Sequence, residues 1–401
     1  DNGDGTWDYA QTQRDWDLVY SLPGAVDVVM RYAEMAGSGV FDETLMAFTT
    51  YTGTMRDMTM TQVIAVMDEP EQRSTYTVGA SSWESTSTPS ASGGVDGTLT
   101  YTTTDTVQTM QVPGIEDPSQ MTDVTITIPR NTLQGTSTGI DMPAIYRLHA
   151  WFVARPSGEA ITRDQADLKA LLIDGLPFFE MIEGTSTVEG ARVASPLGEF
   201  AVASAGVEFA MSGLVTDGLF REVISMTGLT MPAGIVPDWA AGLVPSDSSN
   251  GFEITGFDLA ATAATLLPAL DFTNPDLIDP AVMASVLPQL LPTGAVTVTM
   301  TPGGTTAPLY ALTYEGTMQA GPDAMPTGRA TVTMTGMDAV IDALNASGLT
   351  VEDGIGPGLA MARGVARPGE GGALVWEIDA TVPGTLKING TDYAPMMGGM
   401  E

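Results

Sequence analysis

The stretch Ala330–Asp338 reads ATVTMTGMD and contains the pattern that decides the fold of this chain. Threonine alternates with Val and Met as far as Thr335, and this period of two is typical of a β-strand. Gly336 permits a turn, and Asp338 can cap a helix whose apolar side continues to Leu344. The stretch therefore predicts a strand that leads through a glycine turn into a helix.

A similar order of residues occurs 80 positions earlier, in Ile254–Asp258 (ITGFD). It predicts a strand that ends near Gly256 and a helix that Asp258 caps. Two explanations remain open. One is an internal duplication of a strand-to-helix unit, and the other is independent use of common capping chemistry.

Most of the remaining chain also predicts strands, because short runs rich in Thr, Val, Tyr and Met alternate between turn-forming residues. The predicted strands are residues 55–67, 98–104, 107–112, 124–128, 144–153, 199–211, 296–300, 309–318, 330–335 and 374–382. Residues 81–97, rich in Ser, Thr and Gly, predict a mobile loop between strands. The turn dipeptides Pro383-Gly384 and Asn389-Gly390 predict a closing meander.

Two more helices complete the predicted elements. Thr162 and Gln165 form a capping box for a helix that ends before Pro177, and Asp279 followed by Pro280 begins another. This order of elements predicts an α+β fold: a large curved antiparallel sheet of meander repeats, with a few amphipathic helices packed on one face. We expect a β-rich N-terminal half over residues 1–182 and a β-rich C-terminal half over 183–401, or one continuous domain.

The formal net charge of -34 reflects a shortage of bases, since 49 Asp and Glu face only 15 Lys and Arg. Charged residues total 16%, against about 25% in an average domain. Such a chain has no basic surface for nucleic acid or for charge-driven docking on an anionic membrane. Its longest apolar stretches, residues 259–270 and 282–291, are shorter than the roughly 20 residues of a transmembrane helix. There is no cysteine, which excludes disulfides and thiolate chemistry.

The C-terminal segment Ala373–Tyr393 (ALVWEIDATVPGTLKINGTDY) and the stretch from Pro237-Asp-Trp239 to Leu259 carry a resemblance. Over roughly the last 200 residues the chain resembles a family of uncharacterised alphaproteobacterial envelope proteins, defined by a domain of unknown function. The resemblance implies a β-rich body and a place in the cell envelope, and it supplies no catalytic residues. Since the sequence begins at Asp1 without Met, we expect that a signal peptide has been removed and that the protein is periplasmic or secreted.

Several residues and motifs are candidates for catalysis or for binding calcium, phosphate or copper. His149 is the single histidine and lies in a predicted strand without a nucleophile motif. The strings Asp1-Asn2-Gly-Asp4 and Gly354–Gly358 match a calcium loop and a phosphate loop only partly, and we expect a flexible terminus and an ordinary loop. Methionines spaced like a copper site are better explained as packing residues. They are Met55, Met58 and Met60, and Met396, Met397 and Met400.

No catalytic motif emerges, so we expect neither an enzyme nor a bound cofactor. The leading hypothesis is a non-enzymatic envelope protein that binds a lipid or other hydrophobic ligand, or docks an envelope partner, through an apolar groove on two helices. The groove residues are Leu259, Leu266, Leu267, Val282, Met283, Val286, Leu287 and Leu290.

Two alternatives belong to other functional classes. The first is a structural or accessory subunit of an envelope assembly. The second is a hydrolase that uses carboxylates or a divalent cation. Its candidate acids are Glu253, Glu315, Glu377 and Asp379.

Overall fold

The computed structural model is mostly β, with a large antiparallel sheet and several helices, which confirms the coarse prediction of an α+β fold. The structure describes residues 2–22, 25–64, 71–114, 117, 120–274, 278–322, 324–347 and 355–393. These residues form two compact units. Unit 1 comprises residues 1–137, 184–207 and 226–235, and unit 2 comprises 138–183, 208–225 and 236–401.

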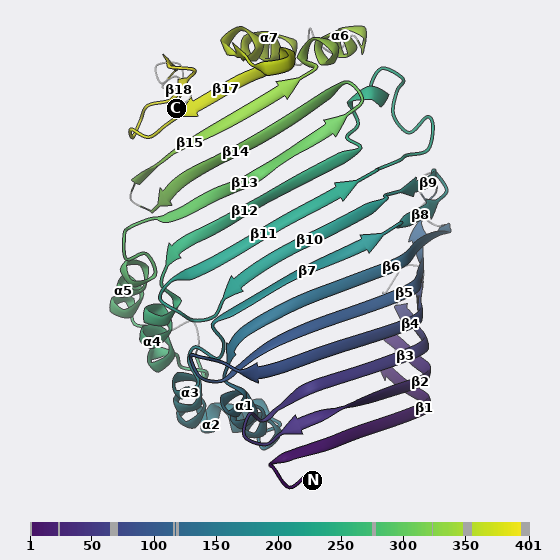
Figure 1. Ribbon diagram of the computed structural model, residues 1–401, viewed down its shortest axis with the longest axis vertical. Helices are drawn as coiled ribbons and strands as arrows, with labels where there is room; N and C mark the ends of the chain where they lie inside the picture. The colour runs from purple at the N-terminus through teal and green to yellow at the C-terminus, as the bar shows by residue number, and fades with distance from the viewer. Residues whose placement is uncertain are drawn as a thin grey trace. The chain divides into compact units, whose positions relative to one another are not determined.

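Five long strands form the body of unit 1, and each pairs antiparallel with the next along the chain (Figure 1). They are β1 (Thr6–Leu22), β2 (Val26–Asp42), β3 (Ala47–Ile64), β4 (Gln72–Pro89) and β5 (Val95–Pro113). The predicted loop over residues 81–97 is therefore wrong, because only residues 90–94 connect β4 to β5. Its Ser and Thr residues were read as loop composition, whereas they alternate along paired strands.

One row of residues interrupts the regular alternation of these five strands. Asp15, Asp57 and Asp105 have φ angles of 51°, 52° and 52°, in the left-handed region that L residues rarely adopt. They lie on β1, β3 and β5, at the same register position as Ala33 of β2 and Gly79 of β4. The register between neighbouring strands is the same on both sides of this Asp row, so every strand contributes one residue to it.

Side chains that share a face are three residues apart across the Asp row, instead of two. Val78 and Ser81 are both buried on β4, and their partners Thr106 and Thr103 are both buried on β5. The Tyr32 hydroxyl likewise donates to Gln13 Oε1, although Tyr32 pairs with Trp16 on the far side of the row. The row therefore shifts the phase of the alternation by one residue in all five strands together.

In unit 2, five more strands pair antiparallel (Figure 1). They are β12 (Asp247–Phe257), β13 (Val296–Ala307), β14 (Tyr310–Gly321), β15 (Ala324–Thr335) and β17 (Leu374–Asp379). The other strands of the chain are β6 (Met121–Ile140), β7 (Met181–Glu189), β8 (Arg192–Ser195), β9 (Gly198–Ala201), β10 (Ser204–Ser212), β11 (Gly218–Thr227), β16 (Arg367–Pro368), β18 (Lys387–Ile388) and β19 (Thr391–Asp392).

The described helices all belong to unit 2. They are α1 (Met142–Val153), α2 (Gly158–Arg163), α3 (Gln165–Asp174), α4 (Leu259–Ala269), α5 (Pro280–Leu290), α6 (Met337–Ser347) and α7 (Ile355–Val365). In Figure 1, α4 and α5 lie beside the ends of the unit 2 strands. None of the described helices is both long and apolar enough to cross a membrane.

Two of the predicted strand-to-helix joints are confirmed. Gly256 and Gly336 have φ angles of 87° and 79°, and α4 and α6 follow them. Asp258 caps α4 by accepting from Ala261 N at 2.7 Å. Asp338 does not act as the predicted cap, because it lies inside the first turn of α6 and pairs with Arg363 of α7 at 3.0 Å.

Two predicted elements are wrong in type. Residues 144–153 form most of α1 instead of a strand, because the Asp141 side chain caps the helix through Ala144 N and Pro143 occupies its first turn. Residues 355–358 begin α7 instead of a loop, while Gly354 lies outside the described residues. In both segments the start signal of a helix was hidden by residues more typical of strands or turns.

The side chains are weakly buried for a chain of this size. The accessible surface is 23,040 Å² for 41.8 kDa, whereas a compact monomer of that mass exposes about 15,000 Å². No side chain in the described ranges is less than 2% exposed. Along β1, β3 and β14, most residues on both faces are exposed or half-buried.

The left-handed backbone of the Asp row gives a prediction for Asp57. Substitution by Val should lower the free energy of unfolding by about 1–2 kcal/mol, because a β-branched residue strains this conformation, whereas Asp57→Gly should be tolerated. Urea unfolding followed by circular dichroism measures both. Thr59→Val, on extended backbone two residues away, is the control. Equal destabilisation by Val and Gly would contradict the role assigned to the row.

Candidate functional site

The phase shift at the Asp row keeps the charged side chains of β1–β5 outside the row away from one face. Outside the row, the charged residues of these strands share the opposite face, where Arg14 pairs with Glu34 and Arg31 with Asp17. We call the other side the uncharged face of unit 1. Its aromatic and aliphatic residues on β1–β3 are Trp7, Tyr9, Trp16, Leu18, Tyr20, Leu22, Val26, Val28, Met30, Tyr32, Met35, Phe41, Phe48, Tyr51, Met55, Met58, Met60 and Ile64.

Aromatic rings gather at one end of this face. The Phe48 ring centre lies 5.6 Å from Tyr9, 5.3 Å from Phe41 and 5.0 Å from Tyr51. Such distances are favourable for edge-to-face and tilted aromatic pairs. Trp83 lies directly across Gly53, so that no Cβ would fit there. The glycine lets the indole lie flat on the strand and present a broad apolar surface.

Several of these apolar side chains remain open to solvent. Trp7 is 44% exposed, and on the same strand Leu18, Tyr20 and Leu22 are also exposed. Soluble monomers rarely leave contiguous apolar surface uncovered, and such surface commonly marks a binding site. The uncharged face of unit 1 is therefore a candidate binding surface.

Unit 2 has the same division into two faces. The charged residues of β12–β15 and β17 share one face, and the register places only uncharged residues on the other. This uncharged face of unit 2 is formed by Phe252, Ile254, Val296, Val298, Met300, Leu312, Tyr314, Gly316, Met318, Ala320, Gly328, Ala330, Val332, Met334, Leu374, Trp376 and Ile378.

A hollow of about 300 Å³ lies on the uncharged face of unit 2. Val298, Met300, Met318 and Ile378 supply its apolar walls. A Cβ at Gly316, which also lines it, would lie 2.7 Å from Met300 Cε, so the glycine keeps room for that side chain. Met300 and Met318 are 37% and 41% exposed, so flexible thioether side chains border an accessible apolar hollow.

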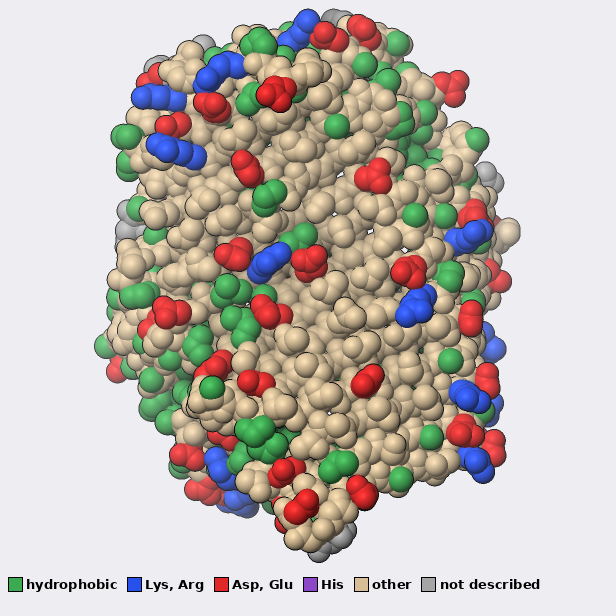
Figure 2. Space-filling view, viewed as in Figure 1, with side chains coloured by type: hydrophobic (Ala, Val, Ile, Leu, Met, Phe, Trp, Pro, Cys, Tyr) green, Lys and Arg blue, Asp and Glu red, His purple; other side chains and the backbone are tan. Residues whose placement is uncertain are grey.

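Figure 2 shows one side of the molecule, where tan atoms of uncharged polar side chains and backbone prevail, acids and basic residues are scattered, and apolar groups are sparse. By register, the four candidate acids of the hydrolase hypothesis lie on the charged face of unit 2, and two of them form ion pairs. Glu377 pairs with Arg367, and Asp379 lies 3.7 Å from Arg329. Hydrogen bonds from Thr381 lower the pKa of Asp379, which therefore does not suit a general acid.

The predicted groove residues lie on two neighbouring helices. Leu259, Leu266 and Leu267 belong to α4, and Val282, Met283, Val286, Leu287 and Leu290 belong to α5. Thr265 of α4 donates to Gln289 of α5, which joins the two helices. Met283 and Leu287 are 49% and 43% exposed, and the other six are half-buried. The structure brings these residues together, and their role in binding stays a prediction.

Three methionines are the other residues weighed from the sequence that the register places on an uncharged face. His149 is exposed on α1. Asp4 accepts hydrogen bonds from Thr6 N and Oγ1, and Asn2 also donates to Thr6, whereas Asp1 lies outside the described residues. No group of three or more metal-ligating side chains occurs among the residues that the structure describes.

Met55, Met58 and Met60 all lie on the uncharged face of unit 1, on either side of the Asp row. Met396, Met397 and Met400 fall outside the described residues. The sequence did signal the face on β3, since Met55 and Met58 are three residues apart. That spacing was weighed as a copper motif and attributed to packing, and the shift in phase was not predicted.

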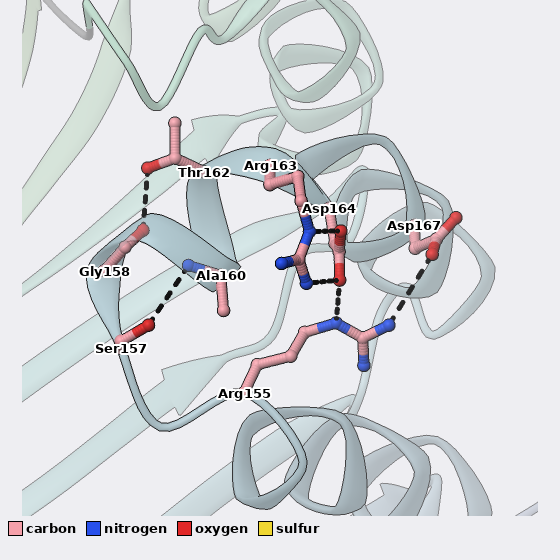
Figure 3. A network of polar contacts seen from close by, with 8 residues as sticks. All are labelled: Arg155, Ser157, Gly158, Ala160, Thr162, Arg163, Asp164 and Asp167. Atoms are coloured by element: carbon pink, nitrogen blue, oxygen red, sulfur yellow. Dashed lines mark hydrogen bonds and ion pairs between the residues drawn. The ribbon is translucent and has the colours of Figure 1, made fainter.

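A network of ion pairs joins the first three helices (Figure 3). Asp164 accepts from Arg155 Nε at 2.7 Å and from Arg163 Nε and Nη2 at 2.7 and 2.9 Å. The capping-box prediction is wrong, because Ser157 caps α2 and Thr162 donates back to Gly158 O. Hydrogen bonds from Arg163 and then Arg155 hold the pKa of Asp164 far below its usual range.

Comparisons of this chain with protein-family models, with curated proteins and with solved structures found no match.

A substitution at Asp164 tests whether its ion pairs with Arg155 and Arg163 stabilise the packing of α1, α2 and α3. Asp164→Asn should lower the urea midpoint, because Arg155 and Arg163 lose their shared carboxylate. A carboxyl whose folded pKa is depressed stabilises the fold above its unfolded pKa of about 4 and loses that effect as the pH falls. The difference between wild type and variant should therefore shrink below about pH 4. Asp174→Asn, which breaks an exposed pair with Arg147, should have little effect.

Proposed function

We propose that this protein binds a lipid or another hydrophobic molecule on its uncharged sheet faces and does not catalyse a reaction. One observation carries the proposal: β1–β5 in unit 1, outside the Asp row, and β12–β15 with β17 in unit 2 keep charged side chains off one face, and apolar side chains on that face remain exposed. A face maintained by a coordinated shift in five strands is a specific feature of the fold, since one-residue errors would bring charges onto it.

The free energy of binding would come from apolar area removed from water, at about 25 cal/mol per Å². Exposed Met300 and Met318 suit a ligand of variable shape, because thioether side chains adapt to irregular surfaces. The hollow between them, of about 300 Å³, is at the lower end of the roughly 300–1,000 Å³ typical of ligand pockets, so it would hold part of an acyl chain. The groove predicted on α4 and α5 is a second apolar surface of unit 2 that could continue such a site.

The finer points of the fold prediction also belong to this proposal. Left-handed residues bend a strand, so the Asp row should curve the unit 1 sheet around its uncharged face, where Val78 and Thr103 are buried. In unit 2, the Trp376 indole donates to Ala362 O of α7 at 2.7 Å. We propose that α7 covers one part of the uncharged face and leaves the hollow open.

Docking in an envelope assembly is a second candidate function. It is favoured by exposed apolar residues on α1, where Tyr146, Phe152 and Val153 are 40%, 42% and 67% exposed. Their display on one short helix is typical of a contact with another protein. A periplasmic location in a Gram-negative cell remains a proposal that rests on the resemblance to envelope proteins.

A pair of neighbouring residues on β14 tests lipid binding. N-phenyl-1-naphthylamine, an uncharged fluorescent probe, should bind the wild type. Met318→Asp should weaken binding at least about tenfold, because a carboxylate in the hollow costs over 1.4 kcal/mol to desolvate. Gln319→Asp introduces the same charge on the opposite face and should bind nearly as well as wild type.

Mass spectrometry of lipids extracted from the purified protein gives an independent measurement. Recovery of one or more co-purified lipids in the wild type, reduced in Met318→Asp, is the expected result. Equal losses in the two β14 variants, or no probe binding by the wild type, would refute the proposed function.

A further inference from the structure

Most of the positive charges in the described part of the chain lie beside acids of the same chain. Eleven arginines in the described part of the chain lie within 4.0 Å of a carboxylate. The whole sequence contains 15 Lys and Arg against 49 Asp and Glu. A ligand with a phosphate or carboxylate group would therefore find few cations to pair with.

The surroundings of the unit 2 hollow show the same imbalance. Arg329 is the one base among the residues that line it, and Asp379 lies 3.7 Å from its Nε atom. Glu253, Glu315 and Glu377 lie on the opposite face of the same strands. Lys387 of β18 also lies opposite Asp379 in the register. Glu253 and Glu315 have no Lys or Arg within ion-pair distance among the described residues, so acids outnumber bases on the charged face behind the hollow.

A single layer of strands separates these carboxylates from the uncharged face. Strand backbones and side chains on one side of a sheet span about 5–10 Å, which is no greater than the Debye length of about 10 Å at 0.1 M salt. The acids therefore repel an anionic group held on the uncharged face, although none of them touches it. A neutral group experiences no such repulsion, and a zwitterionic group experiences little.

We infer that the uncharged face of unit 2 selects lipids whose headgroup has no net charge, diacylglycerol-like or zwitterionic, over anionic lipids with the same acyl chains. This inference rests on the proposed function and adds the class of ligand. The acyl chain occupies the hollow between Met300, Met318 and Ile378, and the headgroup lies at its rim. Charge on the far face of the sheet, and not a contact with the headgroup, sets the preference.

Three lipids with identical chains separate these effects: dioctanoylglycerol, dioctanoylphosphatidylcholine and dioctanoylphosphatidylglycerol. Each is titrated against bound N-phenyl-1-naphthylamine at about 10 mM and about 1 M salt. At low salt the anionic lipid should require at least about a tenfold higher concentration for half-displacement than the other two. We call the ratio of these half-displacement concentrations the gap. At high salt, where the Debye length falls to about 3 Å, the gap should narrow to about twofold or less.

Variants then locate the charges responsible. Glu253→Gln combined with Glu315→Gln should narrow the gap at low salt and leave the affinity for dioctanoylglycerol unchanged, which also shows that the fold is intact. Glu159→Gln combined with Asp174→Asn is the control. It also removes two negative charges, but from α2 and α3, and it should leave the gap unchanged.

The outcomes test the inference and the proposed function separately. Equal displacement by all three lipids, or preference for the anionic one, overturns the inference while the proposed function stands. A gap that Glu253→Gln and Glu315→Gln do not narrow also overturns it. Displacement by none of the lipids refutes the proposed function itself, and a dimer that excludes the probe would identify a second copy as the occupant.

Discussion

Successive side chains of a β-strand point to opposite faces, and the uncharged faces of both units depend on that constraint. A strand of 17–19 residues gives the alternation many chances to place a charge on the wrong side. In unit 1 the constraint is met by shifting phase at Asp15, Asp57 and Asp105, in step with Ala33 and Gly79. The shift in each strand makes sense only with the same shift in its neighbours, because cross-strand partners must share a face.

The coarse fold follows from the sequence because period-two alternation of Thr with Val and Met is a local signal, and β13–β15 are strands where it predicts them. The lengths of the strands do not follow. Ser81–Pro89 was interpreted as a loop from its Ser and Thr content, since composition was given more weight than alternation. The helix α1 was missed for a related reason: the run from Ala144 to Val153 is rich in residues that also suit strands, and the cap at Asp141 decides its conformation.

The candidate site was only partly predictable. The sequence identifies apolar helices, and the structure does place Leu259 to Leu267 beside Val282 to Leu290 on α4 and α5. It does not reveal that the strands have uncharged faces, because this requires the register between segments that are distant in sequence. Nor does it reveal the hollow at Met300 and Met318, which exists because Gly316 and Gly328 lie between larger residues on adjacent strands. Pairing between strands, and not the order of residues, creates both features.

The Asp row also determines how such a sheet can change during evolution. A single insertion or deletion in β3 would move half of that strand out of phase with β2 and β4, and Thr and Arg residues would replace Met and Tyr on one face. Only a change repeated in the adjoining strands would keep the faces separate. Point substitutions that preserve polarity can occur one at a time. Insertions and deletions must occur together in adjoining strands, or add or remove whole hairpins. Related proteins should therefore differ freely in residue identity along these strands and agree closely in the number of residues on each side of the row.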